Sequence, residues 1–110
     1  MFIKLGDEKR EDRIYANELV ITGKICDAFS NDGQHLFFHS SLLDYIYNKD
    51  GIVIYLKSGD VIYCKWALWH HIYDGIYFYV YYDIDQRDLI AEIKIDNVAS
   101  IFDSDMLPFY

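Results

Sequence analysis

Tyrosines alternate with aliphatic and phenylalanine side chains in the run from Ile76 to Tyr81, which Tyr82 follows. In a β-strand, a period of two sends Ile76, Phe78 and Val80 to one face and the intervening tyrosines to the other. The same alternation recurs in three further runs between residues 52 and 96. It predicts one apolar face that forms a core, made of Ile52, Ile54, Leu56, Ile62, Cys64, Trp66, Ile76, Phe78, Val80, Leu89, Ala91, Ile93 and Ile95.

The opposite face of these strands is a mixture of rings and charges. A tyrosine suits such a face because its ring provides contact area while its hydroxyl group bonds to water or to a partner. Two arrangements are possible for this face. A hairpin over residues 19–38 can pack on the face and form a second core, or the face can stay open as an interaction surface. Its members are Tyr55, Lys57, Tyr63, Lys65, Tyr77, Tyr79, Tyr81, Glu92, Lys94 and Asp96.

Turn residues divide the chain into short elements. Asp32-Gly33 supplies the positive φ of a hairpin turn between the runs 19–26 and 35–38. Ser40 and Ser41 can cap a short helix, in which Leu42, Leu43, Ile46 and Tyr47 share one side. Four strand-like runs follow Gly51, and residues 98–102 add a fifth.

These elements predict a mainly β fold, a small, strongly bent antiparallel sheet with an N-terminal β-hairpin and one short helix, and their order resembles that of an SH3-like barrel. At 110 residues, the chain fits a single domain with a core of its own. Within that domain we expect a hairpin segment over residues 1–38, the small barrel over residues 40–103, and a tail over residues 104–110.

Two segments resemble the motifs of the Sm-like fold. Val53-Ile54-Tyr55-Leu56-Lys57-Ser58-Gly59-Asp60 is similar to the start of the first Sm motif, and Ile95-Asp96-Asn97-Val98-Ala99-Ser100-Ile101 is similar to the second. The resemblance covers residues 40–103 and implies a small bent barrel, which in that family commonly forms a ring that binds RNA. The chain departs from the family at Asp96-Asn97, where a basic pair such as Arg-Gly or Lys-His is usual.

The charge balance argues against nucleic acid as the partner. The chain has 18 acidic and 10 basic residues, a formal net charge of −8. Residues 74–105 contain eight acids against only Arg87 and Lys94. Such a field repels a phosphate backbone and favours a basic partner. The N-terminus turns acidic at once and has no apolar signal-peptide region, and no apolar run reaches the length of a membrane helix, so we expect a cytoplasmic protein.

No catalytic, metal or cofactor signature stands out. Cys26 and Cys64 are expected to be small buried hydrophobes in a reducing compartment. His70 and His71 are adjacent, so on a strand they point to opposite faces and cannot both bind one metal without a bend. We therefore expect no cofactor and no catalytic site. A small enzyme that uses His70 or His71 with a nearby carboxylate remains an alternative.

These observations favour a small acidic, non-catalytic binding protein that docks on a basic protein surface, for instance that of a nucleic-acid-binding protein. An acidic domain with exposed rings can occlude a nucleic-acid groove, as nucleic-acid mimics, immunity proteins and phage-encoded inhibitors do. The predicted partner-binding residues are Tyr55, Tyr63, Tyr77, Tyr79, Tyr81, Asp83, Asp85, Asp88 and Glu92. The alternative from the family resemblance is an Sm-like oligomer whose aromatic side chains stack on the bases of single-stranded RNA.

Self-association is a further expectation. The run 98–102 has no proline and no inward charge, the features that usually protect a sheet edge. If this run lies at an edge, it can pair with a second copy of the chain. We therefore predict a homo-oligomer.

Overall fold

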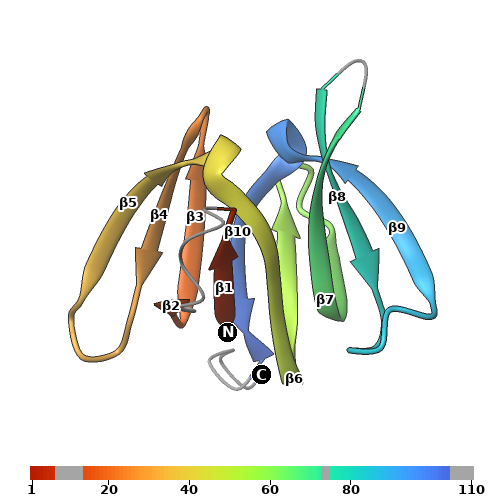
Figure 1. Cartoon of the computed structure of the whole chain (residues 1–110), viewed down its shortest axis with the longest axis horizontal. Coiled ribbons are helices and arrows are strands. Elements are labelled where there is room, and N and C mark those ends of the chain that lie inside the picture. Colours follow the sequence, from red (N-terminus) through yellow and green to blue (C-terminus); the bar gives the residue numbers. More distant parts are fainter. Residues whose placement is uncertain (7–13, 73–74, 105–110) are drawn as a thin grey trace.

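The computed structural model describes residues 1–6, 14–72 and 75–104, with only the main chain described for residues 71 and 72. The described chain forms a single ten-stranded sheet in which every pairing is antiparallel (Figure 1). The strands are β1 (Phe2–Leu5), β2 (Ile14–Tyr15), β3 (Glu18–Thr22), β4 (Ile25–Phe29), β5 (His35–His39), β6 (Leu43–Leu56), β7 (Val61–Ile72), β8 (Gly75–Tyr81), β9 (Leu89–Lys94) and β10 (Val98–Asp103).

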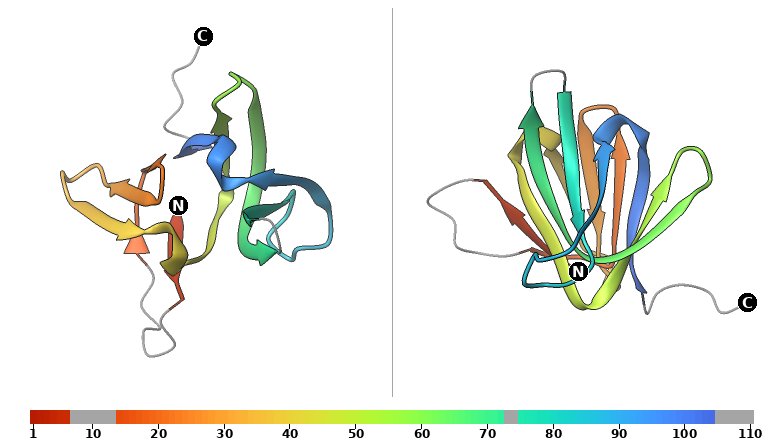
Figure 2. Two further views of the ribbon diagram at one scale, coloured as in Figure 1. Left: turned by 90° about the horizontal axis from the view of Figure 1, so that it is seen from above. Right: turned by 90° about the vertical axis from the view of Figure 1, so that its right-hand side faces the viewer.

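The sheet has the order β5-β4-β3-β10-β6-β7-β8-β9, and β1 branches from β6 to pair with β2. It therefore has two lobes, one made of β3, β4 and β5 and the other of β7, β8 and β9, with β1, β6 and β10 between them (Figure 1). The strands curve strongly in all views (Figure 2). The prediction of a mainly β, bent antiparallel sheet is confirmed.

The barrel closure that the Sm-like resemblance implies is not seen. The sheet is open, because its end strands β5 and β9 do not pair with each other in the described part of the chain. A 3-10 turn, η2 (Ile95–Asn97), links β9 to β10 without a β9–β10 ladder.

The N-terminal segment is a three-stranded meander instead of one hairpin. The run 19–26, expected to be a single strand, turns at Gly23 with a φ of 60°. The expected hairpin at Asp32-Gly33 is present and joins β4 to β5. The meander joins the sheet edge to edge, because Leu19 of β3 pairs with Ile101 of β10. It therefore extends the sheet and does not lie over the tyrosines of β6, β7 and β8.

The predicted helix at residues 41–47 is wrong. Only a 3-10 turn forms, η1 (Ser40–Leu42), where the Nδ1 of His39 accepts a hydrogen bond from the backbone N–H of Ser41. The following residues belong to β6, since Ile46 pairs with both Ile3 and Ala67. A short apolar run fits both periods, and pairing with two neighbouring strands decides for the β-strand.

β6 is a long strand that bends in its middle. Its first half pairs with β1 and its second half with β10, on the same side of the strand. The two halves meet at a register shift between Tyr47 and Ile52, where Gly51 has a φ of 107° that disfavours other residues. This bend lets one strand serve both lobes.

The edge that was predicted for self-association is also not free. β10 lies inside the sheet, with Ile101 paired to Ile54 on one side and to Leu19 on the other. The reasoning that placed a free edge at residues 98–102 is therefore wrong. Homo-oligomer formation stays a prediction without that support.

Alternation identified most of the core correctly. Ile52, Ile54, Cys64, Phe78, Val80, Ile93 and Ile95 are buried, while Leu56, Ile62, Ile76 and Ala91 are half-buried and pack against them. Leu89 was assigned to the core but is 48% exposed on the edge strand β9. Trp66 was also assigned to the core. Cys64 and Ala67 are both buried although they are three residues apart, so the period of two breaks between them, and Trp66 lies on the outer face, where it stacks on Tyr45 and Tyr47.

Candidate partner-binding face

A line of aromatic residues crosses five neighbouring strands on the outer face of the sheet. Tyr15 of β2 pairs with Phe2 of β1, which pairs with Tyr47 of β6; Tyr47 pairs with Trp66 of β7, and Trp66 with Tyr81 of β8. Residues directly opposite each other in a sheet share a face, so these five side chains form one row. We call Tyr15, Phe2, Tyr47, Trp66 and Tyr81 the aromatic row.

The rings of the row pack on one another. Trp66 stacks on Tyr47 with centroids 5.0 Å apart, and also on Tyr45, two residues away on β6, at 4.5 Å. Phe2 stacks on Tyr47 at 5.4 Å and meets Tyr15 edge-on at 5.3 Å. The row is partly exposed, with Tyr15 at 51% and Phe2 at 38%. Ring contacts thus join Tyr15, Phe2, Tyr47 and Trp66, and the backbone ladder adds Tyr81 to them.

A second line of residues lies beside the row on the same face. Tyr79 of β8 pairs with Glu92 of β9 and with Leu68 of β7, and Leu68 pairs with Tyr45. The imidazole of His70 stacks on Tyr79 with centroids 4.8 Å apart. Tyr77 follows one pair further along, opposite Lys94. The register thus brings the predicted residues Tyr77, Tyr79, Tyr81 and Glu92 together on one face.

Asp83, Asp85 and Asp88 lie in the loop after β8, beyond the Tyr81 end of the aromatic row. The loop is closed by a hydrogen bond from the N–H of Tyr82 to the carbonyl of Asp88, at 3.0 Å. The Asp85 carboxylate pairs with the Arg87 guanidinium at 3.0 Å, so part of its charge is neutralised. Desolvation raises the pKa of Asp83, but the side chain of Asp85 and backbone N–H groups lower that pKa by more, so Asp83 is ionised at neutral pH.

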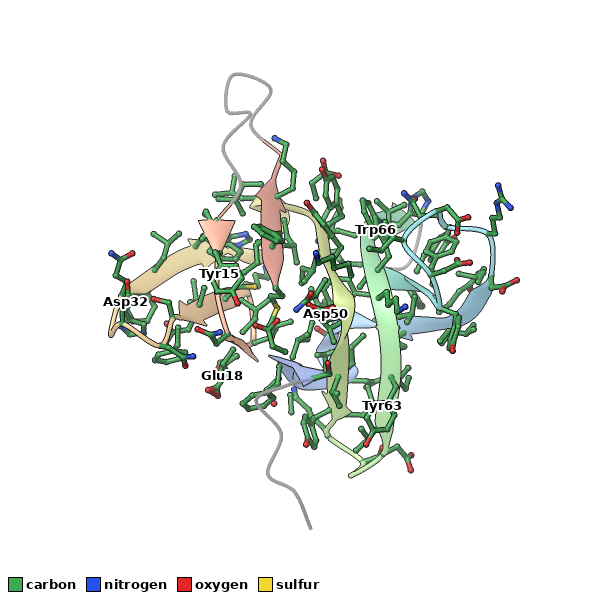
Figure 3. The ribbon with its side chains drawn as sticks, turned by 90° about the horizontal axis from the view of Figure 1, so that it is seen from below. Tyr15, Glu18, Asp32, Asp50, Tyr63 and Trp66 are labelled. Carbon is green, nitrogen blue, oxygen red and sulfur yellow. The ribbon has the colours of Figure 1, made fainter. Side chains whose placement is uncertain are left out.

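Tyr63 lies on β7 opposite Val53 of β6, away from Trp66 and the row (Figure 3). It is 63% exposed, and Tyr82, the residue after β8, is 60% exposed. Both rings line a cavity of about 190 Å³ whose other residues include Asp50, Lys65 and Ser104. This cavity forms where the bulge of β6 separates two stretches of the β6–β7 ladder.

Tyr55 is separated from the other predicted residues. It lies on the second half of β6, opposite Val61 and Ser100, and its ring meets Phe102 edge-on at 5.4 Å. It belongs to the β10 side of the sheet and does not join the aromatic row. The structure thus divides the predicted site into the face around Tyr79, the acidic loop, the Tyr63 cavity and an isolated Tyr55.

Sequence reasoning missed five aromatic residues of this surface: Phe2, Tyr15, Tyr45, Tyr47 and Trp66, the last of which it had assigned to the core. Phe2 and Tyr15 come from short N-terminal strands, and Tyr45 and Tyr47 from the segment interpreted as a helix. The alternation Tyr45-Ile46-Tyr47, with a fully buried Ile46, was the signal that could have revealed the second pair.

The histidines and cysteines have local roles. Within the described residues, His70 has no hydrogen bond or ion pair to a carboxylate, and the side chain of His71 lies outside them. His35 pairs with Asp27 through Nε2 and stacks on Phe29, at 4.3 Å between centroids. Burial raises the pKa of both Cys26 and Cys64 to about 12, so neither thiol is a ready nucleophile. No group of three potential metal ligands occurs in the part of the chain described.

Comparison with known proteins returned no relatives: no family model, no curated protein and no solved structure matches this chain. None of the helices described is long and apolar enough to span a membrane.

Proposed function

We propose that this protein is a non-catalytic binding protein that docks on a basic protein surface through its outer aromatic face and the acidic loop 83–88. The observation that carries the proposal is the unbroken, in-register aromatic row across five neighbouring strands. The side chains of this row lie outside the hydrophobic core and leave part of their ring area exposed. Tyr and Trp are also the residue types enriched where binding energy concentrates in interfaces.

The acidic loop supports a basic partner. Asp83 and Asp88 lie just beyond Tyr81, and the chain as a whole carries a net charge of −8. Charges at the rim of an interface accelerate encounter with an oppositely charged partner more than they strengthen the final complex. A rigid aromatic surface with such a rim suits the occlusion of a lysine- and arginine-rich surface. The proposed role is therefore that of an inhibitor or masking protein.

The ring packing disfavours the alternative of single-stranded RNA. Nucleobases stack on aromatic side chains that offer their faces. In the aromatic row, Trp66 covers faces of both Tyr45 and Tyr47, and Phe2 stacks on Tyr47. A base would have to separate these rings before it could stack between them. A protein partner can instead contact ring edges and tyrosine hydroxyl groups as they stand.

The test is capture on the immobilised chain at low salt with three matched forms. The first is the parent, the second Tyr81→Ser in the aromatic row, and the third Ile25→Ser, which changes a residue 47% exposed on the other lobe. We expect a basic protein that the parent and Ile25→Ser retain, that Tyr81→Ser loses, and that salt releases. Thermal melts of all three forms verify that the fold persists.

The same three forms are tested against a fluorescent oligouridine. The proposal is overturned if the oligouridine binds with an affinity that Tyr81→Ser weakens, because the face would then be a nucleic-acid platform. It is equally overturned if every captured protein is retained by Tyr81→Ser as well as by the parent.

A further inference from the structure

The cavity beside Tyr63 has the composition of a site for a cationic side chain. Two of its walls are the rings of Tyr63 of β7, 63% exposed, and of Tyr82, which directly follows β8 and is 60% exposed. Its volume of about 190 Å³ is that of a small side-chain pocket. A guanidinium or ammonium group over a tyrosine face is attracted by the negative face of the ring.

Asp50 lines the cavity, and its backbone is held in place at the β6 bulge. Its main-chain N–H donates to Asn48 Oδ1 at 3.0 Å, and its carbonyl accepts a hydrogen bond from Ser104 Oγ at 2.9 Å. Both contacts use the backbone and leave the carboxylate without a hydrogen bond or ion pair to any described residue. Asp50 and Tyr63 lie on adjacent strands of the same underside of the molecule (Figure 3).

From these contacts we propose that the Tyr63–Tyr82 cavity binds one arginine side chain of the partner, with the guanidinium against the two rings and paired with Asp50. The inference rests on the proposed function and specifies its partner's anchor residue. Arginine fits better than lysine because its planar, weakly hydrated guanidinium stacks on rings and pairs with a carboxylate at the same time.

Charge around the cavity favours this occupant. Lys65 lines the cavity and opposes a cation, but Asp50 offsets it, and the acidic loop follows Tyr82 directly in the chain. The loop has three carboxylates against Arg87 alone. The field at the cavity mouth is therefore negative despite Lys65, and removal of the lysine charge should strengthen binding.

The experiment is an NMR titration of the ¹⁵N-labelled full chain with N-acetyl-arginine amide. The control ligand is N-acetyl-citrulline amide, which has nearly the same shape and no charge. We expect saturable shifts at Tyr63, Lys65 and Tyr82 with the arginine compound, and at least about a fivefold weaker response to citrulline, since both the ring contact and the ion pair need the charge.

Variants then assign the contacts. Tyr63→Leu, Tyr82→Leu and Asp50→Asn should each weaken the arginine affinity by about two- to fivefold. Lys65→Gln should strengthen it by about twofold. The inference is overturned if arginine and citrulline shift the same residues equally, or if shifts do not saturate or concentrate elsewhere.

The inference and the proposed function fail separately. If arginine binds in the cavity but no captured basic protein is lost on Tyr81→Ser, the arginine site is confirmed and the proposed function is wrong. If a basic protein is captured through the aromatic row but Tyr63→Leu and Tyr82→Leu retain it with unchanged affinity, the function stands and the arginine anchor is wrong.

Discussion

The carboxylate of Asp103 pairs with the α-ammonium group of Met1, and neither group is exposed to solvent. Asp103 also accepts hydrogen bonds from Asn48 at 3.0 Å, from Asn17 at 3.2 Å and from the hydroxyl of Tyr15 at 3.3 Å. This polar centre lies between β1, β3, β6 and β10, where the two lobes meet. A buried charge is tolerated only when it is paired and hydrogen-bonded, and all the donors around Asp103 satisfy that condition.

We predict that Asp103→Ala destabilises the fold by about 3–5 kcal/mol, because it leaves a buried ammonium group and two amides without their acceptor. The exposed Asp96→Ala, a matched loss of one carboxylate, should change the free energy of unfolding by less than about 0.5 kcal/mol. Denaturant melts of the three forms give the comparison. Equal small losses in both variants would show that the polar centre contributes little to stability.

The two faces of β8 provide a second prediction. Phe78 is fully buried, whereas its neighbour Tyr79 is half-buried and stacks on His70. Phe78→Ala should cost about 3–5 kcal/mol, the usual range for the loss of a buried phenylalanine, and Tyr79→Ala clearly less. Urea melts measure both. Similar large losses would mean that the tyrosine face is packed as tightly as the core and is not available to a partner.

The alternation of apolar residues was sufficient to predict β8 and much of the core, because each of those strands keeps one face buried along its length. It failed where the period breaks. The period of two breaks between the buried Cys64 and Ala67, which leaves Trp66 on the outer face, and the bend at Gly51 makes one strand from a segment interpreted as a helix and a strand. Such irregularities depend on which strands become neighbours, and that is not encoded in a local pattern.

The candidate face shows the same limit. Tyr77, Tyr79 and Tyr81 could be grouped from one strand, but their neighbours Phe2 and Tyr47 come from pairings across the chain. The aromatic row exists because Phe2 on β1 meets Tyr47 on β6 and Tyr47 meets Trp66 on β7. Contacts between residues so far apart in sequence are set by tertiary packing. Tyr55 illustrates the opposite error, since it shares a period with the face and yet packs on Phe102.

The stacking of Trp66 on Tyr47 provides a third prediction. A double-mutant cycle with Trp66→Leu and Tyr47→Leu should give a coupling energy of about 0.5–1.5 kcal/mol, as expected for an aromatic pair in contact. The control cycle combines Trp66→Leu with Tyr55→Leu, which lies on the other half of β6. That control should be additive. A coupling near zero for Trp66 and Tyr47 would indicate that the row is not held together by its rings.

Thiol chemistry provides a fourth prediction. Burial raises the pKa of Cys26 and Cys64 from 9.0 to about 12, so the folded chain keeps these thiols protonated at pH 8. Both should react slowly with a disulfide reagent until denaturant is added. The thiols of the unfolded chain ionise at lower pH than those of the folded chain. The contribution of the two buried thiols to the free energy of unfolding should therefore be fully present below pH 9 and be lost between pH 9 and 12. Rapid labelling of both thiols in the native protein would contradict this expectation.

The acidic loop provides the last prediction. Reversal of Asp83, Asp85 and Asp88 to Lys should leave the melting temperature nearly unchanged, because these residues lie in a loop outside the hydrophobic core. The association rate with the captured basic partner should fall by about tenfold or more at low salt, and the dissociation rate should change much less, because rim charges steer encounter.

The control for the loop variant reverses Glu18, Asp60 and Asp96, which changes the net charge by the same amount at other places on the chain. Stopped-flow association at several salt concentrations separates local from global charge. If steering is local, only the loop variant loses rate, and its difference from the parent disappears as salt rises. If both variants slow equally, the net charge alone guides encounter and the loop has no special role. If the loop variant unfolds while its rate in the folded fraction is unchanged, the loop is a structural element and the proposed rim is wrong.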